Sequence, residues 1–426
     1  MINKNKLKIG VVGLGYVGLP LAIEFAKKGV TVTGIEIDKG RLDNIKRKVS
    51  YISDVTTGEL RTFLANGKFK ATSEFCELKA CDAVLVCVPT PLKGKYLPDI
   101  SFIKYSLNSV AKNIKKGALV ILESTTYPGT TEEVILPIFK DHGLRHGKDF
   151  YLCFSPERID PGNKKFPVNK IPKVVGGITR EATSLGVSLY KIIIDKVVPV
   201  SSARAAETVK LLENTFRLIN IGLIDELAMM AHKMNIDIWE VVNAASTKPF
   251  GFMPFYPGPG VGGHCIPKDP LYLYWKAKSF GFRSRFIKLA SDVISFMPEY
   301  VASRIDDALS KKGLKIQEAK ILIVGVTYKK DIKDLRKSPS IDLINSLKKK
   351  GSKVAYFDPL ISHLKIDDLN LESIVLSKRA LARFDCVAIA TEHSSINYRF
   401  LLDNSKLIFD TRNAYKGINS KKVVKL

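Results

Sequence analysis

Short apolar runs rich in β-branched residues alternate with helix-like stretches over about the first 200 residues of the chain. The runs are KIGVVG, VTVTGIEI, AVLVCVP, GALVILES and FYLCFSPE. Runs of this length and composition are typical of buried strands, and their alternation with helices is typical of a parallel sheet covered by helices. The sequence therefore predicts an α/β domain over residues 1–202.

The pattern changes at about residue 203, where a helical stretch without proline continues to residue 235. A loop rich in glycine and proline follows over 248–270, and further helical stretches reach about residue 313. Strand-like runs then return as KILIVGV, KVAYFDP, FDCVAIAT and KLIFDTR. We expect a helical middle domain over 203–313, introduced by the long helix, and a second α/β domain over 314–426.

The first strand-like run leads directly into a GxGxxG pattern that opens a helical stretch. Its residues are Gly13, Leu14, Gly15, Tyr16, Val17 and Gly18. Such glycines allow a tight turn, close approach of the backbone to a pyrophosphate and close helix packing, and the helix N-terminus favours the anion. The pattern predicts a Rossmann-like, doubly wound domain that binds a dinucleotide; a glycine-rich turn without a ligand is the alternative.

Glu36 lies 18 residues after the last of these glycines, at the end of the second strand-like run. A carboxylate there binds the ribose hydroxyls and repels a 2′-phosphate, so the sequence favours NAD over NADP. Asp38 is the second choice for this acid because it lies on the same side of an extended strand. Arg41 also belongs to this cofactor region and leaves NADP open.

A weak internal repeat links the two α/β regions. The segment after residue 320 repeats the plan of the first: strand, loop, helix, glycine, strand and acid. The second loop keeps one glycine and has Tyr328, Lys329 and Lys330 in place of the others. It therefore offers charged side chains where the first loop offers bare backbone, and we expect another Rossmann-like domain there.

The loop FYPGPGVGGHCIPKDP (255–270) is too rich in glycine and proline to form a helix or strand. It contains a lone thiol, Cys265, with His264 before it and Lys268 after it, and a helical stretch begins after Pro270. Cations and helix N-termini favour thiolate, the reactive form of cysteine. Cys265 is therefore a candidate nucleophile, with simple packing as the alternative.

Lys210 and Asn214 lie at i and i+4 on the long helix and so share one face. An NAD enzyme with a cysteine nucleophile needs a proton acceptor and oxyanion donors, which a lysine and an asparagine can supply. The alternative is a solvated helix face. Glu157 ends a strand-like run, where α/β sheets place ligands, and is a candidate base or orienting acid or else a capping or ion-paired carboxylate.

The amino-acid composition limits the kinds of molecule that the protein can be expected to bind. Lys+Arg (67) exceed Asp+Glu (42), a net charge of +25, which fits nucleic acid, a membrane surface, a phosphorylated substrate or simply a lysine-rich surface. No run is long enough for a membrane span. The six cysteines include no CxxC pair, which favours a reducing cytoplasm, and His142 and His146 lack a third metal ligand. We expect no bound metal, nucleic acid or membrane.

These motifs resemble the UDP-glucose/GDP-mannose dehydrogenase family over nearly the whole chain, and within it the branch that oxidises UDP-N-acetylhexosamines. The matching segments are GLGYVGLPLA, VCVPTP, ESTTYPGTT, FSPERIDPG, KLLEN, GPGVGGHCIPKDP and YKKDIKDLRKSPS. The resemblance implies oxidation of the sugar C6 alcohol to a carboxylate with two NAD. Cys265 attacks the aldehyde, and the thiohemiacetal is oxidised to a thioester that water hydrolyses. A two-electron hydroxyacid dehydrogenase would need neither Cys265 nor a third domain.

The resemblance also assigns roles. Lys210 is implied as base and charge stabiliser, Asn214 as oxyanion donor, Asp269 as the residue that positions water, and Glu157 as the one that assists hydrolysis. Thr90, Thr126 and Arg336 join Glu36 around NAD. The three domains then become an NAD-binding domain (1–202), a central helical and dimerisation domain with the cysteine loop (203–313) and a UDP-sugar-binding domain (314–426).

The substrate side follows from the same resemblance. Lys329 and Arg412 would neutralise the diphosphate, and the residues implied to contact the hexose are Tyr256, Gly258, Gly260, Glu157, Arg158, Lys210 and Asn214. We expect UDP-N-acetyl-D-glucosamine as substrate, with UDP-N-acetylgalactosamine, UDP-N-acetylmannosamine and UDP-glucose as alternatives. The product would serve surface polysaccharide such as O antigen or capsule, and the long helix implies a homodimer or higher oligomer.

Overall fold

The computed structural model describes residues 6–52, 54–94, 97–158, 167–263 and 265–426. The chain divides into two compact units. The first unit comprises residues 1–213 and 271–282, and the second comprises residues 214–270 and 283–426. The boundary within 213–214 falls inside a single long helix, α7 (Ala203–Lys233), which we expected from the proline-free stretch over 203–235.

The first unit is built on an eight-stranded sheet. Its strands are β1 (Lys8–Val12), β2 (Thr31–Ile35), β3 (Phe69–Thr72), β4 (Ala83–Val86), β7 (Ala118–Leu122), β8 (Phe150–Phe154), β9 (Lys173–Gly177) and β10 (Val197–Pro199), in the order β10-β9-β8-β7-β4-β1-β2-β3. All neighbours pair in parallel except β8 and β9. A short hairpin of β5 (Leu92–Lys93) and β6 (Leu97–Pro98) lies outside this sheet.

Helices cover both faces of this sheet. The helices of the first unit that precede α7 are α1 (Gly18–Lys27), α2 (Lys39–Lys46), α3 (Thr57–Ala65), η1 (Phe75–Ala80), α4 (Ser101–Asn113), η2 (Thr131–Ile135), α5 (Leu136–Asp141), η3 (Val168–Lys170) and α6 (Arg180–Tyr190). Alternate strand residues pack with α1, α3 and α6 in one core and with α4 and α5 in the other. Both faces of the strands are therefore buried, which explains why they read as continuous apolar runs.

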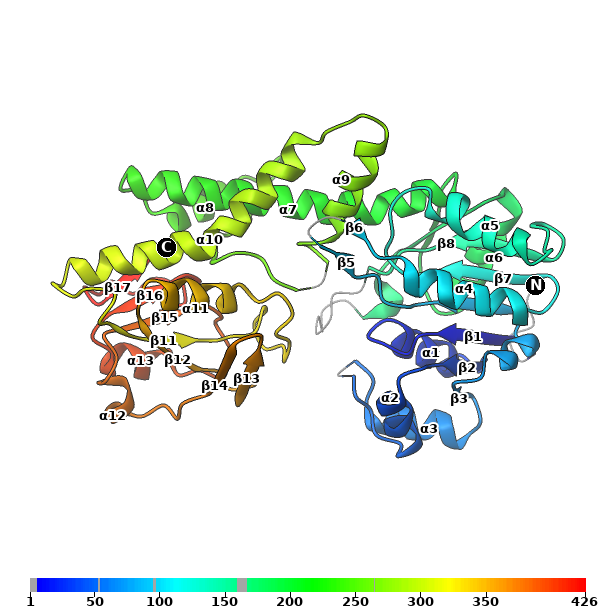
Figure 1. Ribbon diagram of the computed structural model, residues 1–426, viewed down its shortest axis with the longest axis horizontal. Helices are drawn as coiled ribbons and strands as arrows, with labels where there is room; N and C mark the ends of the chain where they lie inside the picture. Colours follow the sequence, from blue (N-terminus) through cyan, green and yellow to red (C-terminus); the bar gives the residue numbers. More distant parts are fainter. Residues whose placement is uncertain (1–5, 53, 95–96, 159–166, 264) are drawn as a thin grey trace. The chain divides into compact units, whose positions relative to one another are not determined.

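The strand order reverses beside β1, which lies between β2 and β4 (Figure 1). Ligands of doubly wound sheets bind in the crevice at the carboxyl ends of strands where the order reverses. The GxGxxG segment follows β1 at this point, so the fold places the predicted dinucleotide loop at the expected edge.

The second unit contains a five-stranded parallel sheet in the order β12-β11-β15-β16-β17. The strands of this sheet are β11 (Lys320–Val324), β12 (Lys353–Phe357), β15 (Cys386–Ile389), β16 (Ile408–Asp410) and β17 (Val423–Lys425). A separate antiparallel hairpin consists of β13 (His363–Ile366) and β14 (Leu369–Glu372). The second unit also contains the helices α8 (Ile238–Ala245), α10 (Arg285–Ser310), α11 (Pro339–Lys349), α12 (Lys378–Leu381) and α13 (Tyr398–Asn404). One face packs on α10 and α11 and the other on α12 and α13 (Figure 1).

The architecture confirms the prediction of two doubly wound α/β sheets with a helical middle region. The nine strand-like runs of the sequence correspond to β1, β2, β4, β7 and β8 in the first unit and to β11, β12, β15 and β16 in the second. Four further strands of the two large sheets, β3, β9, β10 and β17, were not predicted. The predicted helix after Pro270 begins slightly earlier, as α9 (Asp269–Ser279).

Candidate active site

The GxGxxG loop has the backbone geometry that close approach to a pyrophosphate requires. Gly13 has φ +89°, and a Cβ there would lie 2.8 Å from the Cys87 carbonyl oxygen. A Cβ on Gly18 would lie 1.9 Å from the Gly13 carbonyl oxygen, whereas one on Gly15 would meet its nearest atom, Arg41 Nη1, only at 3.8 Å. Gly13 and Gly18 are thus needed for packing, while Gly15 keeps the surface open for a ligand.

The start of α1 completes this cradle. Val17 is the N-cap residue of α1, and its aliphatic side chain accepts no hydrogen bond from the helix N-terminus. Tyr16 is 46% exposed beside it. Because backbone N–H groups at a helix start favour an anion, the residues of this loop fit the pyrophosphate of a dinucleotide.

Glu36 is buried, and its carboxylate is fixed by the loop around it. Oε2 accepts hydrogen bonds from Leu14 N–H at 3.0 Å and from Arg41 Nη1 at 3.1 Å, and Oε1 accepts from Ile37 N–H at 2.9 Å. Asp38 instead caps α2, accepting from Arg41 N–H at 2.8 Å. Glu36 is therefore the acid that faces the glycine loop, and Arg41 neutralises it.

Two threonines of the predicted cofactor site are buried in the first unit. The Thr90 carbonyl accepts a hydrogen bond from the Tyr272 hydroxyl. Thr126 Oγ1 lies 2.7 Å from Thr130 Oγ1, and the Thr130 hydroxyl donates its proton to the Tyr127 carbonyl at 2.8 Å. Thr90 and Thr126 lie in the loops that follow β4 and β7, and each is held by a hydrogen bond with a neighbouring residue.

Glu157 belongs to a buried ionic cluster that the sequence did not predict. Lys173 Nζ lies 2.5 Å from Glu123 and 3.0 Å from Glu157, and the Tyr190 hydroxyl donates to Glu123. Burial disfavours the charged lysine, but the two carboxylates outweigh it and raise the pKa of Lys173. Lys173 therefore stays protonated and orients the Glu157 carboxylate.

Lys210 and Arg158 surround the same segment. Lys210 Nζ donates to the Glu157 carbonyl at 2.6 Å. Arg158 pairs with Glu213 at 2.6 Å and donates to the Pro172 carbonyl at 2.7 Å. The first unit thus brings Lys210, Glu157 and Arg158 together, while residues 159–166 of the same motif lie outside the described residues.

The cysteine loop and Asn214 meet through Asp269 in the second unit. Asn214 Nδ2 donates to Asp269 Oδ2 at 2.7 Å, and both side chains are buried. The Cys265 carbonyl accepts from Asp269 N–H at 2.8 Å, and the Cys265 side chain is exposed. Burial lowers the pKa of the neighbouring Lys268, although Asp269 and Cys265 oppose this. The predicted neighbour His264 lies outside the described residues.

The glycines before Cys265 let this loop lie against the loop that follows β11. A Cβ on Gly262 would lie 2.5 Å from the Lys337 carbonyl oxygen, and one on Gly263 would lie 2.8 Å from the Tyr328 ring. Gly263 N–H donates to the Arg336 carbonyl at 2.9 Å, and Arg336 pairs with Asp334 at 2.6 Å. The Cys265 turn is therefore held against the second sheet's loop.

The remaining residues predicted to bind the hexose and diphosphate, which are Tyr256, Gly258, Gly260, Lys329 and Arg412, belong to the second unit. Gly258 N–H donates to Asp225 Oδ1 at 3.1 Å, and a Cβ on Gly258 would lie 2.6 Å from Arg412 Nη1. Arg412 Nε donates to the Ala390 carbonyl at 2.9 Å. Asp225, on α7, is a further residue that the sequence did not predict; burial raises its pKa to about 8, although Gly258 and Arg412 oppose this.

Tyr256 and Gly260 lie on either side of Gly258 in this loop. The Tyr256 ring stacks on Trp239 at 5.6 Å between centroids, and its hydroxyl donates to Asn243 Oδ1 at 3.1 Å. Gly260 has φ +120°, and a Cβ there would lie 3.1 Å from Pro339. The loop backbone is thus fixed, and Tyr256 remains 45% exposed.

The predicted residues therefore form two sets. The first unit holds the glycine loop, Glu36, Arg41, Thr90, Thr126, Glu157, Arg158 and Lys210; the second holds Asn214, the Cys265 loop, Asp269, Lys329, Arg336 and Arg412. Lys210 and Asn214 are one turn apart on α7.

Within the described ranges, no group of three or more His, Cys, Asp or Glu side chains could hold a metal ion, and none of the helices there is long and apolar enough to cross a membrane.

Comparison with known proteins identifies the family to which the chain belongs. Three models of the UDP-glucose/GDP-mannose dehydrogenase family match the chain: the NAD binding domain over 7–194, the central domain over 204–294 and the UDP binding domain over 322–417. The chain therefore belongs to the UDP-glucose/GDP-mannose dehydrogenase family. It is an oxidoreductase, an NAD-dependent UDP-sugar dehydrogenase, and the predictions of NAD as cofactor and of a UDP-sugar as substrate are confirmed.

Several relatives are similar over most of their length. The chain is 41% identical to the UDP-N-acetyl-D-glucosamine 6-dehydrogenase of Pseudomonas aeruginosa, covering 84% of this chain and 83% of the relative. It is 36% identical to the UDP-N-acetyl-D-mannosamine dehydrogenase of Pyrococcus horikoshii, covering 96% of each. The solved structure of UDP-D-ManNAc dehydrogenase from Pyrococcus horikoshii has a TM-score of 0.89 with 33% identity, covering 98% of this chain and 99% of that one.

Proposed function

We propose that the chain catalyses the four-electron oxidation of the C6 alcohol of a UDP-N-acetylhexosamine, with UDP-N-acetyl-D-glucosamine as the preferred substrate. The observation that carries the mechanism is the Cys265 turn, whose thiol is exposed while its backbone is bonded to buried Asp269, the partner of Asn214. This arrangement supplies a nucleophile beside an oriented amide donor. The 41% identity to a UDP-N-acetyl-D-glucosamine 6-dehydrogenase supports the choice of sugar.

NAD supplies the hydride acceptor for each of two oxidations, and Gly13, Gly15, Tyr16, Val17 and Gly18 with Glu36 would hold it, together with Arg41, Thr90, Thr126 and Arg336. In the first oxidation Lys210 receives the proton of the C6 hydroxyl as the alcohol loses hydride. Lys210 is oriented for this by its bond to the Glu157 carbonyl. Proton acceptance beside the reacting carbon lowers the barrier to hydride loss.

Cys265 then adds as thiolate to the aldehyde carbon and forms a C–S bond. Asn214 donates to the resulting oxyanion: one N–H of its amide is engaged by Asp269, so that its second N–H is oriented. Loss of the second hydride gives a thioester. A covalent sulfur intermediate retains the substrate carbon between the two oxidations.

Water then cleaves the thioester, giving the carboxylate and the free thiol. We assign Asp269 to the positioning of this water and Glu157 to acceptance of its proton. Lys173 supports the latter role because it fixes the Glu157 carboxylate at 3.0 Å in a buried cluster. Lys173 is thus a positioning residue that acts through Glu157.

On the substrate side, Lys329 and Arg412 neutralise the diphosphate, and Tyr256, Gly258, Gly260 and Arg158 contact the sugar. Direct ion pairing of lysine and arginine with phosphate oxygens is strong and geometrically specific. Both cations lie in the region that matches the UDP binding domain. The carbonyl-anchored Arg412 and the glycine loop packed against it support this assignment.

A homodimer or higher oligomer through α7 is part of the proposal. Phe216, Leu223 and Met230 recur every seven residues on this helix and are 47%, 51% and 50% exposed. A stripe of this kind marks an interface with another chain. Light scattering should show that Leu223→Lys lowers the molecular mass, while the control Val375→Lys, at a separate exposed apolar position, leaves it unchanged. An unchanged mass in Leu223→Lys would contradict the interface.

The substrate is tested by supplying each UDP-sugar with excess NAD. UDP-N-acetyl-D-glucosamine should give the highest kcat/KM and two NADH per sugar. The 36% identity to a UDP-N-acetyl-D-mannosamine dehydrogenase makes UDP-N-acetylmannosamine the second candidate, and UDP-N-acetylgalactosamine and UDP-glucose complete the panel. A higher kcat/KM for any of these three would overturn the proposed preference.

None of the six cysteines forms a disulfide, which supports action in a reducing cytoplasm, and we place the product in surface polysaccharide synthesis.

A further inference from the structure

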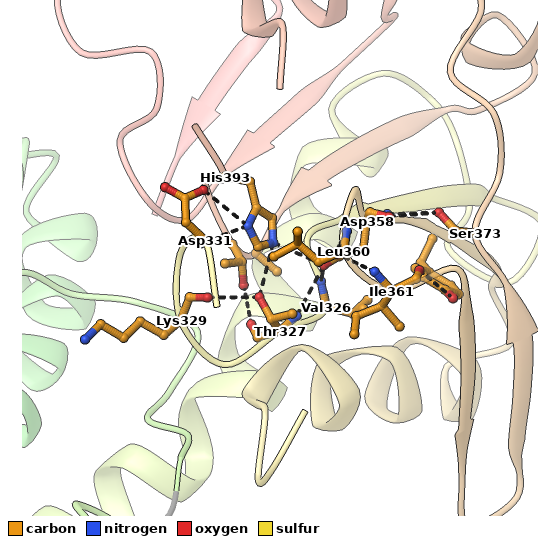
Figure 2. Close-up of polar contacts among 12 residues, drawn as sticks. Val326, Thr327, Lys329, Asp331, Asp358, Leu360, Ile361, Ser373 and His393 are labelled. Carbon is orange, nitrogen blue, oxygen red and sulfur yellow. Dashed lines mark hydrogen bonds and ion pairs between the residues drawn. The ribbon is translucent and has the colours of Figure 1, made fainter. Parts of the chain in front are cut away.

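The loop that presents Lys329 is fixed at the carboxyl edge of the second sheet by a polar cluster whose members are buried except for one exposed aspartate, Asp331. The cluster consists of Thr327, Asp331, Asp358 and His393, and we call it the His393 cluster (Figure 2). Thr327 and Asp331 belong to the loop after β11, Asp358 follows β12 and His393 follows β15. Since β11 lies between β12 and β15, three adjacent strand ends meet here, at a reversal of strand order.

Asp358 holds the start of the loop. Its Oδ2 accepts hydrogen bonds from Val326 N–H at 2.7 Å and Thr327 N–H at 3.4 Å, and its Oδ1 accepts from Leu360 N–H at 2.8 Å. Burial opposes ionisation of this carboxyl, but the bonds from His393 and the backbone outweigh it and lower its pKa. Asp358 is therefore an ionised acceptor buried beneath the loop.

His393 joins both ends of the loop. Its imidazole is fully buried, and Nδ1 accepts the Asp331 backbone N–H at 3.0 Å. Since an amide nitrogen can only donate, Nδ1 carries no proton, and the ring proton is on Nε2. Nε2 lies 3.2 Å from Asp358 Oδ2 and 3.1 Å from Thr327 Oγ1. The hydrogen bonds thus select one neutral tautomer of His393.

Lys329 lies between the two points that His393 holds. The Thr327 hydroxyl donates to the Lys329 carbonyl at 3.0 Å. Asp331 has φ +59°, and its carboxylate accepts from Ser394 N–H at 2.8 Å and the Ser394 hydroxyl at 2.7 Å. Figure 2 shows the Lys329 side chain extending away from the His393 cluster. The bonds therefore fix the Lys329 backbone and leave its ammonium directed elsewhere.

We propose that His393 is a positioning residue for substrate binding: its neutral imidazole holds the 326–331 loop in the conformation that presents Lys329 to the diphosphate of the UDP-sugar. The inference rests on the proposed contact between Lys329 and the diphosphate. It goes beyond that contact because it assigns a role to a side chain that does not itself touch substrate. The charged groups facing the imidazole are Asp358, which follows β12, and Asp331 from the loop.

The test measures UDP binding by calorimetry and KM and kcat for the UDP-sugar, using the full-length protein with NAD. His393→Phe removes the hydrogen bonds of both ring nitrogens and should weaken UDP binding and raise KM about tenfold, as expected for roughly 1.4 kcal/mol, with kcat changed by less than about twofold. His393→Asn keeps an acceptor near the Nδ1 position, and His393→Gln keeps a donor near Nε2, so each should restore part of the loss. These two variants carry the test if His393→Phe does not fold.

A double-mutant cycle with Lys329→Met decides whether His393 acts through the lysine. The double variant His393→Phe/Lys329→Met should bind UDP about as weakly as Lys329→Met alone, because coupled residues are non-additive. Normal UDP binding in His393→Phe, beside weak binding in Lys329→Met, would overturn the positioning role and leave the lysine contact intact. Additive losses would overturn it as well. Normal binding in Lys329→Met would overturn the proposed contact itself, and the positioning role with it.

Discussion

In both units the loop after the first strand of the sheet, β1 or β11, passes over a carboxylate from the end of the next strand. Leu14 N–H donates to Glu36 at 3.0 Å in the first unit, and Val326 N–H donates to Asp358 at 2.7 Å in the second. The glycine before each of these residues has positive φ, and a Cβ on Gly13 or Gly325 would collide with a carbonyl of the neighbouring strand end. The weak sequence repeat thus corresponds to a shared local structure.

The loops differ after this common start. In the first unit α1 begins at Gly18, so close that a Cβ there would strike the Gly13 carbonyl. In the second unit α11 begins only at Pro339, and the intervening loop carries Lys329 and is held by His393. A tight glycine turn offers backbone N–H groups to an anion, whereas a longer braced loop offers an ammonium. The same plan can therefore serve two diphosphate ligands by different chemistry.

The two units also differ in the groups that stabilise their buried carboxylates, and removing the cation of the first unit has the largest expected effect. Glu123 and Glu157 depend on the charged Lys173, whereas Asp358 is supported by backbone amides and a neutral imidazole. Lys173→Met leaves the buried Glu123 carboxylate and the partly buried Glu157 carboxylate without their cation and should lower the free energy of unfolding by about 4 kcal/mol at pH 8. Lys173→Arg, measured alongside by urea denaturation, should lose much less. Equal stability of wild type and Lys173→Met would contradict the role of the cluster.

Gly18→Ala tests the tight turn of the first unit. The added Cβ would lie 1.9 Å from the Gly13 carbonyl oxygen, so that α1 must shift. We expect a loss of about 3 kcal/mol in unfolding free energy and weaker NAD binding. Gly58→Ala is the matched control, because a Cβ there in α3 would meet only Thr56 Oγ1, at 3.9 Å, and should be neutral or stabilising. Equal effects of the two substitutions would mean that the turn tolerates a side chain.

Lys329→Met tests the charged loop of the second unit. UDP binding should weaken about 30-fold, and its dependence on salt should decrease, while NAD binding remains within about twofold of wild type. Lys330→Met is the control, since Lys330 is the exposed neighbour in the same loop. If calorimetry finds the larger loss of UDP affinity in Lys330→Met, the assignment of the phosphate contact to Lys329 is wrong.

Asp225 provides the smallest expected effect and a contrast with Asp358. Burial raises the pKa of Asp225 to about 8, whereas the pKa of Asp358 is lowered. The folded state therefore retains a proton on Asp225 that the unfolded chain loses near pH 4, and stability falls as pH rises from about 4 to 8. Asp225→Asn keeps the acceptor for Gly258 and should remove on the order of 1 kcal/mol of this decline between pH 6 and 8. If the free energy of unfolding depends on pH identically in wild type and Asp225→Asn, the raised pKa of Asp225 is contradicted.

Much of the fold was predictable because a parallel sheet buried on both faces gives strands that are continuously apolar. The missed strands lack this signal. β9 begins with Lys173 and ends in two glycines, β10 ends in Pro199, and β3 and β17 are short segments at the sheet edges. Their pairing is decided by neighbours distant in sequence, which periodicity does not report.

The site was predictable where chemistry is local in sequence. The glycine loop, the cysteine loop and the Lys210/Asn214 pair each stand out by residue type and spacing. Lys173 and Asp225 do not, because their partners Glu123 and Gly258 lie 50 and 33 residues away. The one available signal was a charged residue in an apolar strand or on an apolar helix face. Spacing also left Asp38 open as the ribose acid, whereas the structure shows it capping α2.

The most direct test of the mechanism is the number of NADH formed per UDP-sugar when the sugar is limiting. Wild type should form two NADH per sugar and release the uronic acid, identified by mass spectrometry. Cys265→Ala lacks the thiol that becomes the thioester and should lose this turnover by about a thousandfold or more. A single NADH per sugar in wild type, or unchanged turnover in Cys265→Ala, would contradict four-electron oxidation through Cys265.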